Sequence, residues 1–147
     1  RQMCIRDRLD TMYAANGIGL AAIQIGVPKR IIVMDISKDS EKKEPRYFVN
    51  PIIKNKDSEK ATYEEGCLSV PNQFAEINRP RQCDVEYLDY NGQKQILRAT
   101  GLLATCIQHE MDHLQGILFI DYLSKLKKMM IVKKLSKQKN KIDRFIV

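Results

Sequence analysis

The pattern of apolar and polar positions predicts strands in the middle of the chain. Residues 30–36 (RIIVMDI) are rich in β-branched side chains, and residues 47–54 (YFVNPIIK) form a second such run. Pro51 interrupts the second run, and a proline cannot donate to a sheet ladder, so we expect a bulge or an edge there. The polar segment 37–46 is expected to be a solvated loop, and the polar segment 55–66 a loop or a short strand.

A hairpin and a helix are expected further along. Residues 83–99 form two strand-like runs around Asn91-Gly92, which predicts a type I′ turn. Residues 100–114 have helical periodicity, with Thr100 as N-cap and Gly116 as the stop. Residues 6–17 are expected to end another helix, with Leu9, Met12 and Tyr13 on one face and Asn16-Gly17 as its stop. Residues 124–141 are expected to form a final helix with Leu123, Leu126 and Met130 facing the body. Several antiparallel strands around one buried helix define an α+β fold, and we expect a single domain over residues 1–147.

Composition and charge narrow the class of protein. The 147 residues are 44% hydrophobic and contain no run of about 18 apolar residues, so no membrane span is expected. The first ten residues lack the apolar core of a secretory signal, and the four cysteines show no CxxC spacing, which favours reduced thiols in the cytoplasm. The net charge is +7, of which residues 124–147 carry +8. A nearly neutral body with a basic tail indicates that the tail meets an anionic partner.

The chain's only two histidines indicate a metal site. His109 and His113 flank Glu110 in a His-Glu-x-x-His pattern on the predicted helix, where a spacing of four residues points both imidazoles at one ion. An open catalytic site usually takes three protein ligands. The longer form of the motif would place a third histidine at Phe119, so the third ligand must be a thiolate or a carboxylate.

Elimination favours one cysteine as the third ligand. Cys106 lies on the same helix face, but it is seven residues from His113, roughly 10.5 Å along the axis, so one ion could hardly reach both. Cys83 alternates with core positions of a strand, and Cys4 lies in the atypical N-terminal segment. Cys67 in EEGCLSVP follows a glycine and remains the favoured candidate. Asp121 is a weaker competitor, which is expected to cap or pair near the final helix.

The segment 17–26 (GIGLAAIQIG) carries a second feature. Gly17-x-Gly19-x-x-Ala22 imitates a dinucleotide-binding fingerprint, but a helix-like segment precedes it where a strand is required, so that function is rejected. A glycine turn into a buried strand would explain the glycines. It would not explain Gln24, an amide among apolar residues that needs hydrogen-bond partners or a task.

The motifs GIGLAAIQ, EGCLS and QHEMDHL resemble, in order and spacing, the three signatures of the peptide deformylase family, and the similarity covers about nine tenths of the chain. The resemblance implies removal of the formyl group from the N-terminal formyl-methionine of new bacterial or organellar polypeptides. It implies metal binding by Cys67, His109 and His113, with Fe²⁺ favoured and Zn²⁺, Ni²⁺ or Co²⁺ as alternatives. It also implies that Glu110 moves the proton, while the Gln24 amide and the Leu68 N–H stabilise the oxyanion.

The resemblance further implies a substrate pocket and partners. The expected pocket residues are Ile18, Gly19, Gly66, Leu102, Thr105 and Cys106. Ordinary core packing is the alternative for the side chains among them, and a supporting ion pair is expected between Glu65 and Arg79. The basic final helix suggests ribosome contact, with neither DNA nor membrane as partner and a monomeric state. Family members usually begin about 20 residues earlier, so residues 1–8 are interpreted as a fragment end.

Two other functions stay open at this point. One is a different metallohydrolase, such as a peptidase that cuts internal bonds with the same helix. The other is a ribosome-binding remnant without catalysis, which would hold no metal.

Overall fold

The computed structural model describes residues 2–37 and 41–145, with the backbone alone for residues 2 and 141–145. The described strands are β1 (Gly19–Ala21), β2 (Ile31–Met34), β3 (Arg46–Lys54), β4 (Lys60–Cys67), β5 (Val70–Pro80), β6 (Gln82–Leu88) and β7 (Lys94–Thr100). The helices are α1 (Gln2–Ala14), α2 (Gly101–Leu114) and α3 (Lys125–Phe145), with 3-10 turns η1 (Ala22–Ile25) and η2 (Phe119–Tyr122). Residues 38–40 of the expected loop 37–46 lie outside the described residues. So do residues 146–147, at the end of the basic tail.

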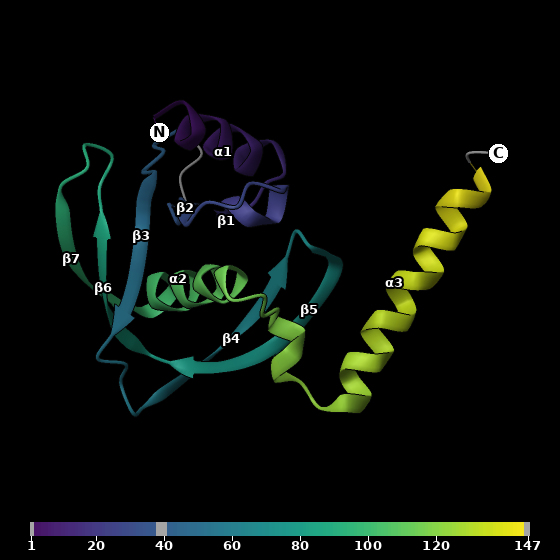
Figure 1. Cartoon of the computed structure of the whole chain (residues 1–147). Helices are drawn as coiled ribbons and strands as arrows, with labels where there is room; N and C mark the ends of the chain where they lie inside the picture. The colour runs from purple at the N-terminus through teal and green to yellow at the C-terminus, as the bar shows by residue number, and fades with distance from the viewer. Residues whose placement is uncertain (1, 38–40, 146–147) are drawn as a thin grey trace.

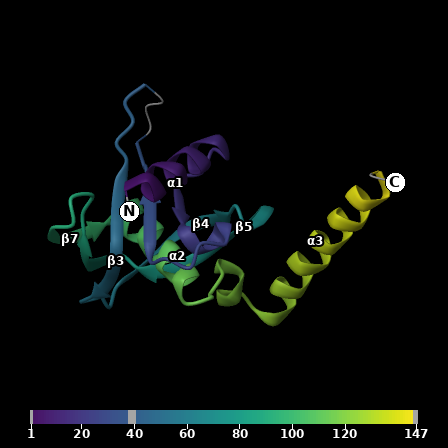
Figure 2. The same cartoon turned by 45° about the horizontal axis from the view of Figure 1, so that its top comes forward.

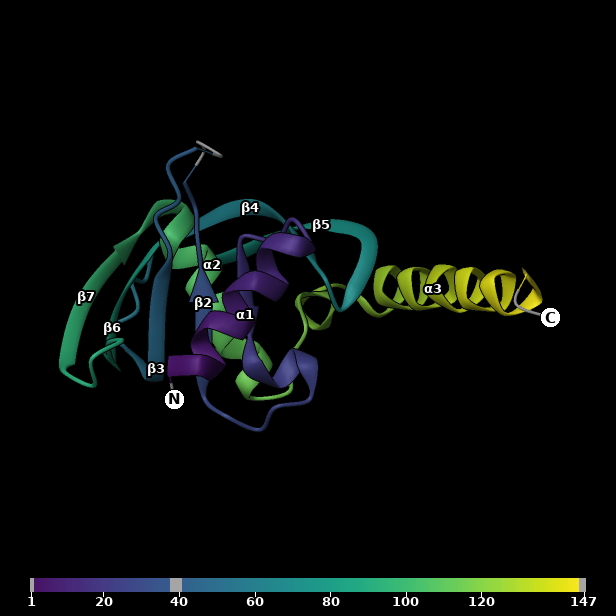
Figure 3. The ribbon, with the colours of Figure 1, turned by 90° about the horizontal axis from the view of Figure 1, so that it is seen from above.

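Two antiparallel sheets enclose the central helix, as the α+β prediction requires. One sheet has the order β1-β2-β3-β6-β7, and β4 and β5 form a separate hairpin. From top to bottom, Figure 1 shows α1, the β1–β2 part of the large sheet, α2 and then the β4–β5 hairpin. Figure 3, seen from above, shows α1 lying across β2 with α2 behind the sheet. Helix α2 therefore touches both sheets.

Strand β2 explains this layering, because all four of its side chains are buried. Ile32 and Met34 pack toward α2, whereas Ile31 and Val33 pack toward α1. A strand that is covered on both faces reads as a continuous apolar run instead of an alternating one. The sequence RIIVM is therefore the local cause of the two-sided core.

Helix α1 ends as predicted. Asn16 takes a left-handed backbone with φ 55°, and the N–H groups of Asn16 and Gly17 donate to the carbonyls of Tyr13 and Met12. This pair of bonds is a Schellman motif. Met12 is fully buried, and Leu9 and Tyr13 pack beside it. Residues 2–8, interpreted above as a fragment end, belong to the same helix, and Ile5 lies in this core.

Two predictions about the strands differ from the structure, and one is confirmed. The type I′ turn at Asn91-Gly92 is wrong, because only Gly92 has a positive φ; the Gly92 N–H donates to the Asp89 carbonyl, and the Asp89 carboxylate accepts from the Asn91 and Gln93 N–H groups. These contacts favour a type I turn followed by a glycine bulge. The polar segment 55–66 contains most of the eight-residue strand β4, longer than expected. The bulge at Pro51 is confirmed, since the β3–β6 register shifts between Val49 and Ile52.

Helix α3 projects away from the body toward its C-terminal end (Figure 2). The predicted inner face is wrong for Leu126 and Met130, which are 69% and 53% exposed. The prediction is confirmed for Leu123, which packs on the cluster formed by Val70, Ile77, Phe119 and Ile120. Ile131 and Leu135 pack on that cluster in place of Leu126 and Met130. Asp121 accepts from the Leu118 N–H and pairs with Lys128, as expected. Among the described helices, none is long and apolar enough to cross a bilayer.

Candidate metal centre and cleft

Three donor atoms from two elements converge beneath the cleft. His109 and His113 lie one turn apart on α2, and their Nε2 atoms are 3.3 Å apart. The Sγ of Cys67, at the end of β4, lies 3.2 Å from the His113 Nε2. All three donor atoms lie within 4.8 Å of one another. The sulfur that elimination selected thus lies beside both imidazoles, whereas Cys106 is a buried member of the core around α2.

The local fold explains why Cys67 points at the helix. The β4–β5 register shifts between Gly66 and Cys67, so that Cys67 pairs with Val70 across the turn Leu68–Ser69. A bulge of this kind bends its strand and re-aims a side chain. Asn72 takes a positive φ of 59° within the bulged strand.

These residues fit a divalent cation. A tetrahedral ion with bonds of about 2.1 Å to nitrogen and 2.3 Å to sulfur separates two nitrogens by about 3.4 Å and a sulfur from a nitrogen by about 3.6 Å. The donors lie close to that spacing before any adjustment. One thiolate with two imidazoles is also a donor set that suits zinc and other late first-row metals.

The cluster favours the thiolate form of Cys67. Burial alone would raise the pKa of this thiol, but hydrogen bonds with His109 and His113 and the N–H of Ser69 outweigh burial and lower the pKa to about 5. For His109, burial acts in the opposite direction and would lower the pKa of the imidazole. Its contacts with Cys67 and Glu65 outweigh burial and raise that pKa to about 10. Metal binding at such a cluster releases the imidazole proton, because a ligating nitrogen must be unprotonated.

Glu110 stands beside the donors in an apolar setting. Its side chain is buried, and desolvation raises the pKa of the carboxyl group to about 7. Within the described residues, its Oε2 has no hydrogen-bond partner, which is unusual for a buried carboxylate oxygen. A carboxyl group with a pKa near neutrality can both accept and donate a proton.

Gln24 has the partners that its setting required. The glycine turn leads into the short strand β1, in which Leu20 and Ala21 are buried, as expected. The next four residues form the 3-10 turn η1, in which Gln24 is half-buried and Ile23 and Ile25 are exposed. Its Oε1 accepts from the Ala21 N–H at 2.8 Å. That bond fixes the amide so that Nε2 faces the Cys67 Sγ at 3.4 Å and the Ser69 Oγ at 3.1 Å.

A buried ion pair supports His109 from behind. The expected Glu65–Arg79 pair is present, with Arg79 Nε 2.7 Å from Glu65 Oε2 and Nη2 2.9 Å from Oε1. Glu65 Oε1 also lies 2.8 Å from His109 Nδ1, so its carboxylate orients the ring. The sequence analysis missed the rest of this network: Arg79 Nη1 reaches Asp112, which also accepts from the Tyr122 hydroxyl.

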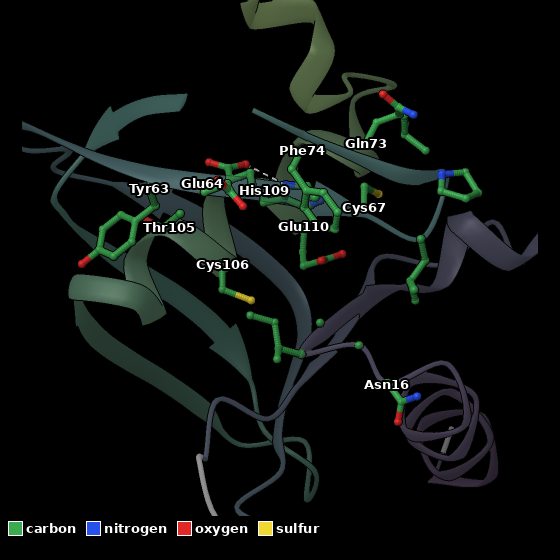
Figure 4. Close-up of a pocket in the computed structure, with 18 of the residues that line it drawn as sticks. Asn16, Tyr63, Glu64, Cys67, Gln73, Phe74, Thr105, Cys106, His109 and Glu110 are labelled. Carbon is green, nitrogen blue, oxygen red and sulfur yellow. Dashed lines mark hydrogen bonds and ion pairs between the residues drawn. The ribbon is translucent and has the colours of Figure 1, made fainter. Parts of the chain in front are cut away.

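The donors open onto a cleft of ≈ 460 Å³. Figure 4 shows Cys67, His109 and Glu110 together, with Phe74 close by. Every residue that the sequence analysis assigned to the substrate pocket lines this cleft: Ile18, Gly19, Gly66, Leu102, Thr105 and Cys106. Gln24 and Leu68 line it as well. Phe74 and Val70 were missed, although strand alternation after Pro71 would have placed an aromatic side chain on one face.

Two glycines leave room for side chains that line the cleft: Gly19 for Glu110, and Gly66 for its cross-strand neighbour Phe74. A Cβ on Gly19 would lie 2.8 Å from Glu110 Oε1 and 3.1 Å from Cys106 Sγ. A Cβ on Gly66 would meet the Phe74 ring at 2.5 Å. Side chains at these positions would fill the space next to Glu110 and displace the aromatic ring.

An α+β domain with a His-Glu-x-x-His helix, a converging thiolate and a buried carboxyl group in a cleft has the site of a metal-dependent hydrolase. The chain also matches the family model of polypeptide deformylase over residues 2–129. It belongs to that family.

Similar proteins have the same family name. The peptide deformylase of Pelagibacter ubique is 78% identical over 141 residues, which cover 96% of this chain and 81% of the relative. That of Rhizobium meliloti is 56% identical over 131 residues, covering 89% of this chain and 75% of the relative. The crystal structure of peptide deformylase from Ehrlichia chaffeensis in complex with actinonin superposes with a TM-score of 0.87 at 45% identity, covering 93% of this chain and 82% of that one. The crystal structure of a peptide deformylase from Legionella pneumophila superposes with a TM-score of 0.88 at 45% identity, covering 97% of this chain and 83% of that one.

Proposed function

We propose that this protein removes the formyl group from the N-terminal formyl-methionine of newly made polypeptides and releases formate. The observation that carries the proposal is the convergence of Cys67, His109 and His113 next to the buried Glu110, at the base of a cleft. The reaction is hydrolysis of a linear amide that is not a peptide bond. The two expectations that competed with it, a peptidase and an inactive remnant, fit the family membership less well.

Cys67, His109 and His113 would hold one divalent ion. When bound, the ion supplies Lewis acidity, which lowers the pKa of water from 15.7 toward about 7 and polarises a carbonyl. The residues behind the donors fix their orientation: Glu65 contacts His109 Nδ1 and leaves Nε2 directed at the sulfur side. We further propose Fe²⁺ as the native metal, on the family resemblance alone, and elemental analysis of protein purified without oxygen tests this assignment.

Glu110 is the proton-transfer group in this proposal. Its unpaired, buried Oε2 accepts a proton from the attacking water, and the same carboxyl group then delivers that proton to the leaving amine. The pKa near 7 suits both steps, since the group gives up a proton as readily as it takes one. The missing side chain of Gly19 leaves the space that the Glu110 carboxylate occupies.

Gln24 and Leu68 would stabilise the negative charge that develops on the formyl oxygen. The Gln24 amide is held by Ala21 with its Nε2 toward the cleft, and the Leu68 N–H follows directly on Cys67. Donors that are fixed before the reaction do not need to reorganise during it. One such donor typically contributes about 3 kcal/mol to the barrier.

The cleft walls suit a methionine side chain and a small acyl group. Ile18, Leu102, Thr105 and Cys106 would line the pocket for the side chain. Gly19 and Gly66, on facing walls, offer backbone groups to an extended peptide. A formyl group is the smallest acyl group, so a narrow space beside the buried Glu110 would favour it over acetyl groups.

Formate release tests the function directly. Under oxygen-free conditions, formyl-Met-Ala-Ser should yield formate, and neither acetyl-Met-Ala-Ser nor an internal bond of a longer peptide should be cleaved. Glu110→Gln should keep its metal and lose turnover by at least about 100-fold. Cleavage of internal bonds would favour the peptidase, and absence of bound metal would favour the inactive remnant.

We also propose that α3 contacts the ribosome in the cytoplasm, with the protein itself a monomer. The support is the projection of α3 away from the body and its dense lysines, since phosphate contacts dominate binding to nucleic acids. Replacing Lys133, Lys134 and Lys137 by glutamine should weaken ribosome binding at low salt. Replacing Lys29, Lys60 and Lys94 by glutamine alters the net charge equally, but it should not weaken ribosome binding. Equal binding by both triple variants would refute the contact.

A further inference from the structure

The Glu65–Arg79 pair continues into a network that the proposed mechanism does not use. Arg79 Nη1 lies 2.7 Å from Asp112 Oδ2, and the Tyr122 hydroxyl donates to the same oxygen at 2.7 Å. The Arg79 guanidinium also stands over the Tyr122 ring, 4.8 Å from its centroid. Arg79 is therefore held by contacts from three separate elements: β4, α2 and η2.

The network connects the two elements that carry the metal donors. Glu65 lies two residues before Cys67 on β4, and Asp112 lies between His109 and His113 on α2. Arg79, on β5, bonds to the carboxylates of both. Its guanidinium therefore links the strand that presents the thiolate to the helix that presents the imidazoles.

The arrangement constrains the guanidinium plane. Nε and Nη2 form a two-point contact with Glu65, and Nη1 is fixed from the other side by Asp112. Glu65 then meets His109 Nδ1 in a defined direction. Without Asp112, Arg79 and Glu65 would remain paired, but the contact between Glu65 and His109 would be the pair's one remaining bond to α2 among those described, and Nη1 would no longer fix the guanidinium plane.

We infer that Asp112, steadied by Tyr122, is a positioning residue that acts through Arg79 and Glu65 to set the His109 ring for metal binding. The inference rests on the proposed metal site. A purely structural role would lower stability without changing metal affinity in the folded protein, whereas a positioning role lowers the affinity itself. Partners behind a ligand commonly change metal affinity 10- to 100-fold, and Asp112 is one step further removed.

The test compares metal affinity in four proteins: native, Asp112→Asn, Glu65→Gln and the double variant. Zn²⁺ or Co²⁺ affinity is measured by competition with a chelator, and the absorption spectrum of the Co²⁺ form reports the donor geometry. Asp112→Asn should weaken binding about 3- to 10-fold in the native background. In the Glu65→Gln background the same change should have almost no further effect, because the path to His109 is already broken.

Tyr122→Phe provides a second variant that keeps the ring over Arg79 and removes only the hydroxyl. It should weaken metal binding about 2-fold and shift the Co²⁺ spectrum in the same direction as Asp112→Asn. Tyr13→Phe is the matched control, since the Tyr13 hydroxyl donates to the Asp35 carboxylate far from the donors. That variant should leave the affinity and the spectrum unchanged.

The outcomes separate the inference from the function that it rests on. Two outcomes would refute the positioning role alone. One is native metal affinity in both Asp112→Asn and Tyr122→Phe. The other is an equal loss of affinity from Asp112→Asn in the native and Glu65→Gln backgrounds. Absence of metal binding by the native chain would refute the proposed site itself.

Discussion

A single methyl group at Gly19 tests how tightly the cleft holds Glu110. In Gly19→Ala, the new Cβ would lie 2.8 Å from Glu110 Oε1, whereas ordinary contacts begin near 3.4 Å. The carboxylate must retreat by roughly 0.6 Å, because Cys106 Sγ, 3.1 Å away, closes the other side. Gly19 does not have a positive φ, so alanine suits the backbone.

This displacement should reduce catalysis while the metal stays bound. A misplacement of 1 Å at a reacting centre can lower a rate about 100-fold, so we expect kcat/KM to fall about 10- to 100-fold, equivalent to about 1.4–2.8 kcal/mol of barrier. Formate release from formyl-Met-Ala-Ser measures the loss. Elemental analysis should show native metal content, because the three atoms nearest the new Cβ belong to Glu110 and Cys106 and not to a proposed metal ligand.

A control separates displacement from general destabilisation. Gly92 has a φ of +81° and open space around its would-be Cβ, so Gly92→Ala strains a remote turn and touches nothing in the cleft. It should unfold at a lower temperature and keep native kcat/KM. If Gly19→Ala deformylates within about 2-fold of the native protein, the close packing of Glu110 does not govern its chemistry, and the reasoning is wrong.

Three further substitutions have distinct expected outcomes. Cys67→Ser should lose its metal on dialysis, since a serine hydroxyl is a far weaker ligand than a thiolate; native metal content after dialysis would contradict the assigned ligand. Gln24→Ala should lower kcat about 100- to 1,000-fold with little change in KM, because its amide acts on charge that exists only in the transition state. A change confined to KM would assign Gln24 to substrate binding instead. Ile32→Ala should lower the free energy of unfolding in urea by about 2–5 kcal/mol, since Ile32 is fully buried between sheet and helix. A loss below 1 kcal/mol would mean that this core repacks easily.

Helical spacing and apolar patterning predicted much of the fold and of the site. His109 and His113 share a face because of local helix geometry, which sequence reveals directly. The run RIIVM predicted β2, although its burial on both faces became clear only from the structure. Cys67 was reached by excluding the other cysteines, an argument that needs the predicted helix and strand but no tertiary contact.

Contacts between distant elements could not be predicted in the same way. Asp112 reads as an ordinary polar position of α2, and only the approach of Arg79 from β5 gives it a partner. The inner face of α3 was wrong because apolar residues lie on more than one face of the helix, and only the structure shows that Ile131 and Leu135 meet the body while Leu126 and Met130 do not. The turn at Asn91-Gly92 was wrong because the Asp89 side chain stabilises a different turn.

The donor cluster joins residues that lie 46 positions apart in the chain, Cys67 and His113. A peptide of α2 alone would offer two donors, so high affinity for metal arises only after the β4–β5 hairpin has docked. An ion that binds the native form alone adds about 4.1 kcal/mol to its stability at a thousand times the dissociation constant. Metal supply should therefore protect the hairpin from proteolysis, so that starvation for the metal shortens the protein's lifetime as well as its activity.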